Sequence, residues 1–235
     1  MATDCMHSLL AALANPRVSL HTHETLSDPD PPPVGGSFSF MPSSDPLFIW
    51  IAGNPLGASW ADALERTLAR APAGSTLLCW SGTLADGLFD GDFRNWTRPG
   101  KAAFDQWLDA TRTRLGSHVG GHRLGIVAHH THILSDVSSQ MRLWHELHEH
   151  EIATVLHPAA LIAPSMVRDL NDHLTRAISM VGPRCTLCIL EDITAAGDRI
   201  PWGTGALPHQ QVHALLREFL PPSTPLFVSE PPFFR

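Results

Sequence analysis

Short apolar runs alternate with amphipathic helical patterns along most of the chain, and this alternation constrains the fold more than any other feature. The apolar runs have the length and the β-branched and aromatic content of buried strands. The segments between them place apolar residues three and four positions apart, as the buried stripe of a helix requires. Alternation of this kind predicts a parallel sheet covered by helices. The expected strands are 18–22, 47–52, 75–80, 123–128, 153–157, 185–190 and 225–230, and the expected helices are 59–71, 101–115, 138–151, 165–181 and 209–220.

Chain length and strand number indicate one barrel-like domain. A chain of 235 residues fits a single large α/β domain. The seven expected strands are one fewer than the eight of a closed TIM barrel. Residues 24–46 are rich in Pro, Gly and Ser, which excludes a helix there and predicts a long irregular loop. We therefore expect one α/β domain over residues 1–235, a TIM-type barrel that is reduced or irregular on its N-terminal side.

Charge and hydropathy narrow the range of partners. Sixteen Lys and Arg residues stand against 23 Asp and Glu residues, which gives a formal net charge of −7 without any basic stripe. Nucleic acid and anionic membranes are therefore poor partners. The start of the chain lacks the basic region of a signal peptide, and no run reaches the roughly 18 apolar residues of a membrane span. We expect a cytoplasmic protein that acts on a small molecule, and we leave open whether it forms a homo-oligomer.

Two of the four cysteines have the Cys-x-x-Cys spacing of redox and zinc sites. Cys185 and Cys188 lie within an apolar strand run, where residues three positions apart face opposite sides of the sheet. One metal ion or one disulfide would need both thiols on the same side. The setting therefore favours buried, unreactive thiols.

Polar side chains gather where the expected strands end. In barrels and open α/β sheets, binding and catalytic residues lie at the carboxyl ends of the strands. Because several ends here carry an imidazole or a carboxylate, the pattern predicts an acid–base or metal-dependent site. The chain has no Tyr, so His, Asp, Glu or Lys would have to move protons. The candidates are His21, His23, His129, His130, His132, His157, Glu191, Asp192 and Glu230.

Two near copies of one histidine motif are among these ends. Residues 128–136 read AHHTHILSD, and residues 20–28 read LHTHETLSD. Residues i and i+2 of an extended strand point to the same side, so His130 with His132, or His21 with His23, could bind one metal ion. Imidazole nitrogen is a ligand that several divalent transition metals accept.

The last third of the chain carries a resemblance to a known family. Leu190-Glu191-Asp192 ends a strand, a Gly203-Thr-Gly205 loop follows, an amphipathic helix starts near residue 209, and a last strand ends at Glu230. This order resembles the final two units of the xylose isomerase-like TIM barrel superfamily, which contains sugar phosphate isomerases and epimerases and the endonuclease IV relatives. Looser similarity in 78–82, 125–130 and 155–159 extends the resemblance over roughly residues 47–235.

This resemblance implies a divalent-metal-dependent isomerase or epimerase of a small sugar or sugar-phosphate-like polyhydroxy carbonyl compound. It implies His130, His157 and Glu230 as metal ligands and proton transfer by Asp192 and Glu191. The strand-end histidines add His21 as a further catalytic candidate and His23, His129 and His132 as weaker metal ligands. Relatives commonly use more acids in the metal site, whereas two imidazoles and one carboxylate are a softer set, suited to Zn, Mn, Co or Fe.

Two alternatives remain open. LHTHETLSD and Leu156-His157-Pro158 are similar to motifs of the polymerase and histidinol phosphatase superfamily, which would imply a metal-dependent phosphoesterase. The other alternative is a noncatalytic barrel that acts as a binding or accessory protein. Besides the last Glu, relatives commonly use two acids and a His, and the corresponding positions here hold His129 or His130, His157 and Ile189. This departure from the family pattern favours a barrel without catalysis.

Overall fold

The computed structural model describes residues 21–22, 38–39, 48–147 and 152–228. Within these residues, six strands form one parallel sheet, in the spatial order β10-β7-β6-β5-β4-β3. Six of the seven expected strands are thereby confirmed; five are shorter than expected, and β6 has the expected length but begins one residue earlier. The strands are β3 (Phe48–Trp50), β4 (Thr76–Trp80), β5 (Arg123–Val127), β6 (Ile152–Leu156), β7 (Leu187–Leu190) and β10 (Leu226–Val228).

One α-helix stands between each strand of this sheet and the next, and four short 3-10 helices complete the connections. All five predicted helices are confirmed. The segment expected as one helix over 165–181 is divided, because its first turns form a 3-10 helix that begins at Pro164. The α-helices are α2 (Trp60–Leu68), α3 (Arg98–Ser117), α4 (Val137–Glu146), α5 (Leu170–Val181) and α6 (His209–Phe219), and the 3-10 helices are η1 (Phe93–Trp96), η2 (Ala159–Leu161), η3 (Pro164–Asp169) and η4 (Gly182–Arg184).

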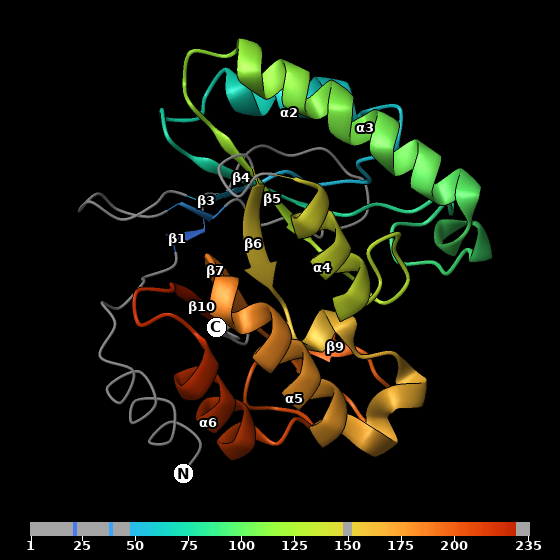
Figure 1. Ribbon diagram of the computed structural model, residues 1–235, viewed down its shortest axis with the longest axis vertical. Coiled ribbons are helices and arrows are strands. Elements are labelled where there is room, and N and C mark those ends of the chain that lie inside the picture. Colours follow the sequence, from blue (N-terminus) through green and yellow to red (C-terminus); the bar gives the residue numbers. More distant parts are fainter. Residues whose placement is uncertain (1–20, 23–37, 40–47, 148–151, 229–235) are drawn as a thin grey trace.

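The strand order makes the sheet a half-barrel. Each strand lies next to its predecessor in the chain, so every crossover steps in the same direction. Because such crossovers are right-handed, all of the helices fall on one face of the sheet. Figure 1 shows this succession, from α2 and α3 above to α6 below. The predicted α/β barrel, reduced relative to a closed one, is confirmed.

Side-chain alternation along the strands produces a separate apolar layer on each face. On the helix-covered face, Leu77 and Cys79 of β4 and Leu124 of β5 join the larger buried cluster. On the inner face, Leu78 and Trp80 belong to a smaller cluster with residues of the neighbouring strands. Burial on both faces is expected of parallel strands, and it explains why their sequences are almost continuously apolar.

The Cys-x-x-Cys thiols are buried, as expected, but they do not lie on opposite sides of the sheet: both belong to the larger cluster, because Cys185 precedes β7 and is not part of the strand. Cys185 and Cys188 are both buried and free. Burial raises the pKa of Cys185 to about 12, so its thiol is protonated and unreactive at neutral pH.

The N-terminal prediction is wrong in part. The end of the strand expected over 18–22 is present as β1 (His21–Thr22), but it pairs antiparallel with β2 (Phe38–Ser39) and not with the parallel sheet. A parallel partner requires a long crossover, usually through a helix, and the Pro-rich segment after residue 24 cannot supply one. β2 therefore lies inside the segment expected to be irregular, and the rest of residues 24–46 lies outside the described residues.

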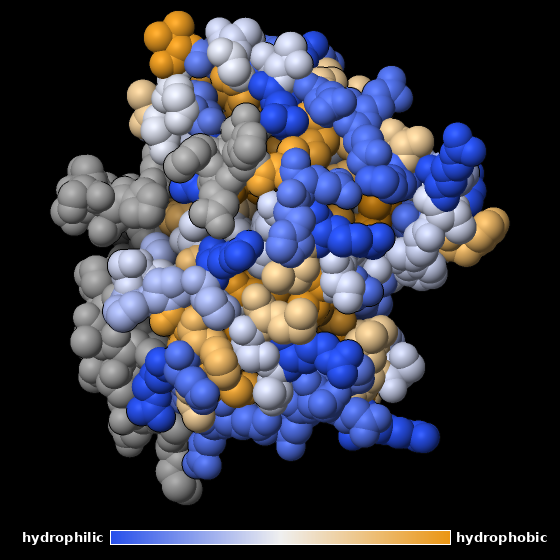
Figure 2. Space-filling model, in the orientation of Figure 1, coloured by the Kyte–Doolittle hydropathy of each residue, from blue (hydrophilic) through white to orange (hydrophobic). Residues whose placement is uncertain are grey.

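The helices have hydrophilic outer faces, as expected of helices that cover a sheet at the protein surface. Figure 2 shows hydrophilic residues over much of the face that α3 and α5 present, with hydrophobic residues visible between the helices. Among the described residues, none of the helices combines the length and apolar composition of a membrane span.

Gly125 of β5 tests the packing of the inner face. A Cβ at this position would lie 2.6 Å from Leu78 Cδ2 and 3.2 Å from Val155 Cγ2. We expect Gly125→Ala to reduce the free energy of unfolding by about 1–3 kcal/mol, because the buried Leu78 and Val155 side chains would have to shift. Urea denaturation measures this change.

Gly116→Ala is the matched control for that measurement. Gly116 lies in α3 with no atom within 4 Å of the added Cβ, so its substitution should be neutral or stabilise by up to ~1 kcal/mol. Equal unfolding midpoints for the two variants would contradict the inner-face packing described above.

Candidate functional site

Polar residues occupy the inner-face positions directly beyond the ends of three strands. Trp80 ends β4 on the inner face, and Val127 and Val155 are inner residues at the ends of β5 and β6. Continued alternation brings His129, His157 and Glu191 to the same side. His129 is 5% exposed and His157 is 2% exposed, so these imidazoles lie inside the protein.

Trp80 is the centre of this arrangement. Its ring is 5.5 Å from that of His129 and 5.6 Å from that of His132, both edge to face. The ring of His157 lies 5.9 Å away, tilted by 31°. Phe89, from the loop after β4, packs against Trp80 at 5.4 Å. The imidazoles therefore face an aromatic floor instead of bulk water.

A hydrogen-bonded group of three residues lies over this floor. His157 Nε2 is 3.2 Å from Glu191 Oε2, and Arg199 Nη1 donates to the same oxygen at 3.2 Å. His157 Nδ1 accepts from the Ala160 amide at 3.4 Å, so Nε2 carries the proton and donates to the carboxylate. The guanidinium carbon of Arg199 lies 4.8 Å from the Trp80 ring centroid and 4.7 Å from that of Phe89, within the range of cation–π contacts.

Burial sets the charge states of the site. It lowers the pKa of His129 to about 2 and that of His132 to about 4. It also lowers the pKa of His157, despite the opposing effect of Glu191. Burial by itself raises the pKa of Glu191, but the hydrogen bond from His157 and the charge of Arg199 lower it overall. At neutral pH the site therefore holds neutral imidazoles, one carboxylate and one guanidinium.

The histidines after β5 do not play equivalent parts. His129 is the inward residue, whereas His130, chosen from the sequence as a metal ligand, is only partly buried and stacks on His129 with ring centroids 4.5 Å apart. The register is thus shifted by one residue from the expected one. His132 is fully buried, and its Nε2 donates to the Leu88 carbonyl at 2.7 Å. Its Nδ1 is buried without a hydrogen-bond partner among the described residues.

Asp192, expected to transfer protons, points to the opposite side of the chain from Glu191. Its Oδ2 accepts from the Gly205 amide at 2.8 Å and lies 2.6 Å from His209 Nε2. Its Oδ1 accepts from the amides of Ile193 and Leu207. The side chain is 0% exposed, so these contacts order the loop 193–208, and Glu191 is the carboxylate that faces the site.

The Gly-x-Gly motif has a backbone role in this loop. Gly203 has φ +85, and a Cβ on Gly205 would lie 2.5 Å from Asp192 Oδ1. The motif therefore allows the chain to turn and then approach the buried carboxylate closely.

The described residues do not fit a metal centre. Among them, no three His, Cys, Asp or Glu side chains are placed to hold one ion. Within the site, His157 Nε2 and His132 Nε2 already donate to protein oxygens, and Glu191 is paired with the guanidinium of Arg199, which would repel a cation. Two of the expected ligands, Glu230 and His23, lie outside the described residues, and His21 is described only by its strand pairing.

Arg199 was not predicted from the sequence. It lies on β9 (Arg199–Ile200), which pairs antiparallel with β8 (Asp192–Ile193) through a turn at Gly197. The sequence does contain a turn signal, Ala196-Gly197-Asp198, shortly after Glu191 and Asp192. A turn there folds Arg199 back toward these two acids.

Comparisons with known proteins give fold similarity only. No protein-family model matches the chain, and no curated protein matches it by sequence. One similar structure is the IolI protein with a binding zinc atom, at 12% identity and a TM-score of 0.45, covering 72% of this chain and 59% of that one. Another is a xylose isomerase-like TIM barrel/4-hydroxyphenylpyruvate dioxygenase fusion protein, at 14% identity and a TM-score of 0.44, covering 75% of this chain and 28% of that one. The chain thus spans less than two thirds of either protein.

The buried Asp192 carboxylate generates a prediction about the loop. Asp192→Ala removes the acceptor for the Ile193, Gly205 and Leu207 amides. Each unpaired buried amide costs about 1–3 kcal/mol, so we expect trypsin to cleave after Arg199 at least about tenfold faster. Mass spectrometry of a timed digest identifies the Arg199–Ile200 cut.

Two controls accompany this digest. Cleavage at Arg176–Ala177 within α5 reports global unfolding in the same sample, and Asp62→Ala removes an exposed carboxylate from α2. An unchanged rate at Arg199 in Asp192→Ala, or an equal increase at Arg176, would show that Asp192 does not hold the loop.

Proposed function

We propose that the protein is an isomerase or epimerase that transfers a proton between adjacent carbons of a small polyhydroxy carbonyl compound. The observation that carries this proposal is the contact of His157, Glu191 and Arg199 at the carboxyl ends of the strands. It brings together a base, a group that orients the base, and a cation. A sugar-like substrate is also what the resemblance of residues 190–230 implies.

Glu191 is the base. Its Oε2 accepts from both His157 and Arg199, whereas its Oε1 has no hydrogen bond to another described residue. The side chain is 23% exposed, so Oε1 can reach a bound molecule. This oxygen would remove the proton from the carbon next to the carbonyl and return it to the neighbouring carbon, or to the opposite face of the same carbon through a second group.

Arg199 stabilises the negative charge that develops on the carbonyl oxygen. A guanidinium has five N–H donors in a plane, and the hydrogen bond from Arg199 Nη1 to Glu191 uses one of them. Stacking over Trp80 and Phe89 fixes that plane before the substrate arrives. A preorganised cation of this kind lowers the energy of an enediolate intermediate without any metal ion.

His157 is a positioning residue. It is buried and neutral, and its Nε2 proton fixes the orientation of the Glu191 carboxylate. The aromatic floor under it excludes water, which strengthens each of these electrostatic contacts.

Solvent exchange tests the proposal directly. The protein is incubated with a panel of aldoses, ketoses and their phosphates in D₂O, and NMR follows deuterium incorporation and product formation. We expect Glu191→Gln to reduce the rate by about 10²–10⁴-fold, the usual contribution of a general base. Glu218→Gln, an exposed substitution on α6, serves as the matched control and should leave the rate unchanged. Equal rates in these two variants would refute the role of Glu191.

The pH profile gives a second test. Because the pKa of Glu191 is lowered, we expect the rate to stay constant through the neutral range and to fall only below the ordinary glutamate value of about 4.3. In Arg199→Gln, the positive charge that lowers the pKa of Glu191 is lost, while burial still raises that pKa. The acid limb of the profile should therefore move to higher pH. If the acid limb lies at the same pH in the unsubstituted protein and in Arg199→Gln, then Arg199 does not influence the pKa of the base.

Metal analysis decides whether an ion takes part, as the sequence resemblance implied. The described donors do not fit an ion, so we expect less than about a tenth of an equivalent of Zn, Mn, Co or Fe after purification without added metal, and full activity after dialysis against a chelator. A stoichiometric metal whose removal abolishes turnover would instead support a metal-dependent reaction with ligands beyond the described residues.

A noncatalytic binding barrel is the second candidate. His157 and Arg199 both pair with Glu191 Oε2 inside the protein, and His132 is 0% exposed, so these groups also fit a structural role. If no sugar exchanges deuterium but one of the panel raises the melting temperature, and Glu191→Gln removes that shift, this candidate replaces the isomerase.

A further inference from the structure

His129 lies on the same inner side as Glu191 but has no part in the reaction proposed above. Its ring centroid is 5.5 Å from that of Trp80 and 5.0 Å from that of Phe89. The guanidinium carbon of Arg199 lies 4.8 Å and 4.7 Å from the centroids of the same two rings. The imidazole and the guanidinium therefore border one space above the aromatic floor.

The hydrogen bonds of His129 determine which of its nitrogens carries the proton. Its Nδ1 accepts from the Thr131 amide at 3.3 Å, and the Thr131 hydroxyl oxygen lies 2.9 Å from the same atom. Because an amide N–H can only donate, Nδ1 is an acceptor and the proton of the neutral ring is on Nε2. Burial, and then neighbouring imidazoles and the charge of Arg199, lower the pKa of His129 to about 2, so the ring is neutral in the physiological range.

The Nε2 proton of His129 has no acceptor within the part of the chain that the structure describes. Protein atoms do not enclose this nitrogen, whereas they do enclose Nδ1 of the neighbouring His132. A histidine that only filled space among aromatic rings would have both nitrogens paired within the protein, because buried polar groups are normally hydrogen-bonded. An N–H that is held in a fixed orientation and left without an acceptor is instead available to a bound molecule.

Three groups with different chemistry thus meet at the carboxyl ends of the strands. Glu191 offers Oε1 as a base, Arg199 offers guanidinium N–H groups, and His129 offers one neutral N–H. Removal of a proton from the carbon next to a carbonyl group gives an enediolate when that carbon also carries a hydroxyl group. The enediolate has oxygen atoms on two adjacent carbons, and a preorganised donor at each oxygen lowers its energy.

We propose that His129 Nε2 donates a hydrogen bond to the hydroxyl oxygen on the carbon next to the carbonyl group, which makes the site selective for α-hydroxy aldehydes and ketones. This proposal rests on the proposed function, in which Arg199 meets the carbonyl oxygen and Glu191 moves the proton. His129 keeps its proton throughout, because Glu191 takes the proton from one carbon and returns it. His129 thus supplies a hydrogen bond and exchanges no atom with the substrate.

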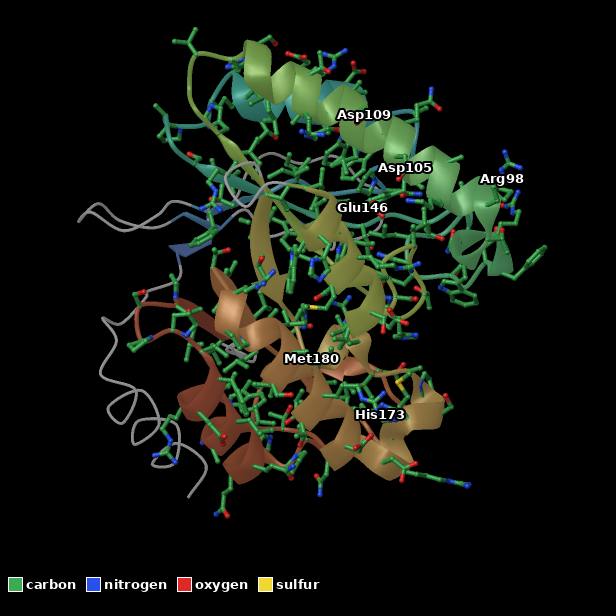
Figure 3. The ribbon with its side chains drawn as sticks, viewed as in Figure 1. Arg98, Asp105, Asp109, Glu146, His173 and Met180 are labelled. Carbon is green, nitrogen blue, oxygen red and sulfur yellow. The ribbon has the colours of Figure 1, made fainter. Side chains whose placement is uncertain are left out.

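Two substitutions at position 129 separate the Nε2 donor from the rest of the ring. An Asn amide lies as many bonds from the backbone as Nδ1 does, so His129→Asn keeps an acceptor for the Thr131 amide and loses the donor to the ligand. A Gln amide extends to the position of Nε2, so His129→Gln keeps that donor. His173→Asn is the matched control, because Figure 3 labels His173 on α5, on the helix-covered face of the sheet.

NMR titration of the full-length chain tests the proposal with two pairs of probes: ribose with 2-deoxyribose, and glucose with 2-deoxyglucose. The deoxy sugars lack the hydroxyl group next to the carbonyl carbon. We expect the 2-hydroxy member of at least one pair to bind about tenfold more tightly, as one hydrogen bond allows. His129→Asn should reduce this preference to less than about twofold without changing the affinity for the deoxy sugar. His129→Gln and His173→Asn should retain most of the preference.

Failure of this inference and failure of the proposed function give different results. If Glu191→Gln abolishes deuterium exchange but His129→Asn keeps the preference for the 2-hydroxyl group, the function stands and the role of His129 is overturned. If no sugar exchanges deuterium but His129→Asn alone removes the preference, the isomerase fails and the His129 contact stands.

Two further outcomes would overturn the inference. The first is the absence of any preference for the 2-hydroxyl group in the unsubstituted protein, a measurement that needs no variant to fold. The second is an equal loss of the preference in His129→Asn and in His173→Asn, which would show a general effect of losing an imidazole. Thermal melts confirm that each variant is folded.

Discussion

The buried carboxylate of Asp192 is the interaction on which the arrangement of the site depends. A buried charge is tolerated only where hydrogen bonds replace its lost hydration, and three amides together with His209 do so here. The amides of Gly205 and Leu207 belong to the end of the loop 193–208, so that loop must return to the sheet. Its return fixes the β8–β9 hairpin, and the hairpin carries Arg199 to Glu191.

Adjacent residues can therefore serve the two faces of one strand end. Glu191 and Asp192 differ by one position, and alternation sends the first to the inner face and the second to the loop. The outer carboxylate is fully buried with four partners, whereas the inner one is 23% exposed with two. The first is suited to holding the backbone and the second to meeting a ligand. The same division explains the position of Arg199. The loop 193–208 is anchored by Asp192 on the outer side, and it carries the Arg199 guanidinium over Trp80 on the inner side.

The periodic parts of this fold were predictable, because each strand and helix is specified by its own local pattern. The inward direction of His157 and Glu191 also follows from alternation. The position of Arg199 does not, because it depends on contacts of Asp192 with residues 13 and 15 positions further along the chain. His129 and His130 show another limit: alternation weakens once a strand has ended, and a choice between neighbours then needs the packing against Trp80. The antiparallel pairing of His21 with Ser39 was equally invisible, since a short strand's partner is set by the connecting chain.

The two edges of the sheet place charge in different ways. At the carboxyl ends of the strands, apolar and aromatic burial keeps His129, His132 and His157 neutral, so the ion pair of Glu191 with Arg199 dominates the local field. At the amino ends, His118 and His122 stand beside two guanidiniums in a more open cleft. At the carboxyl ends, the charges of Glu191 and Arg199 balance each other and the imidazoles are neutral. This balance fits the proposed transfer of a proton from one carbon of a neutral substrate to the next, because that reaction leaves no net charge buried in the site.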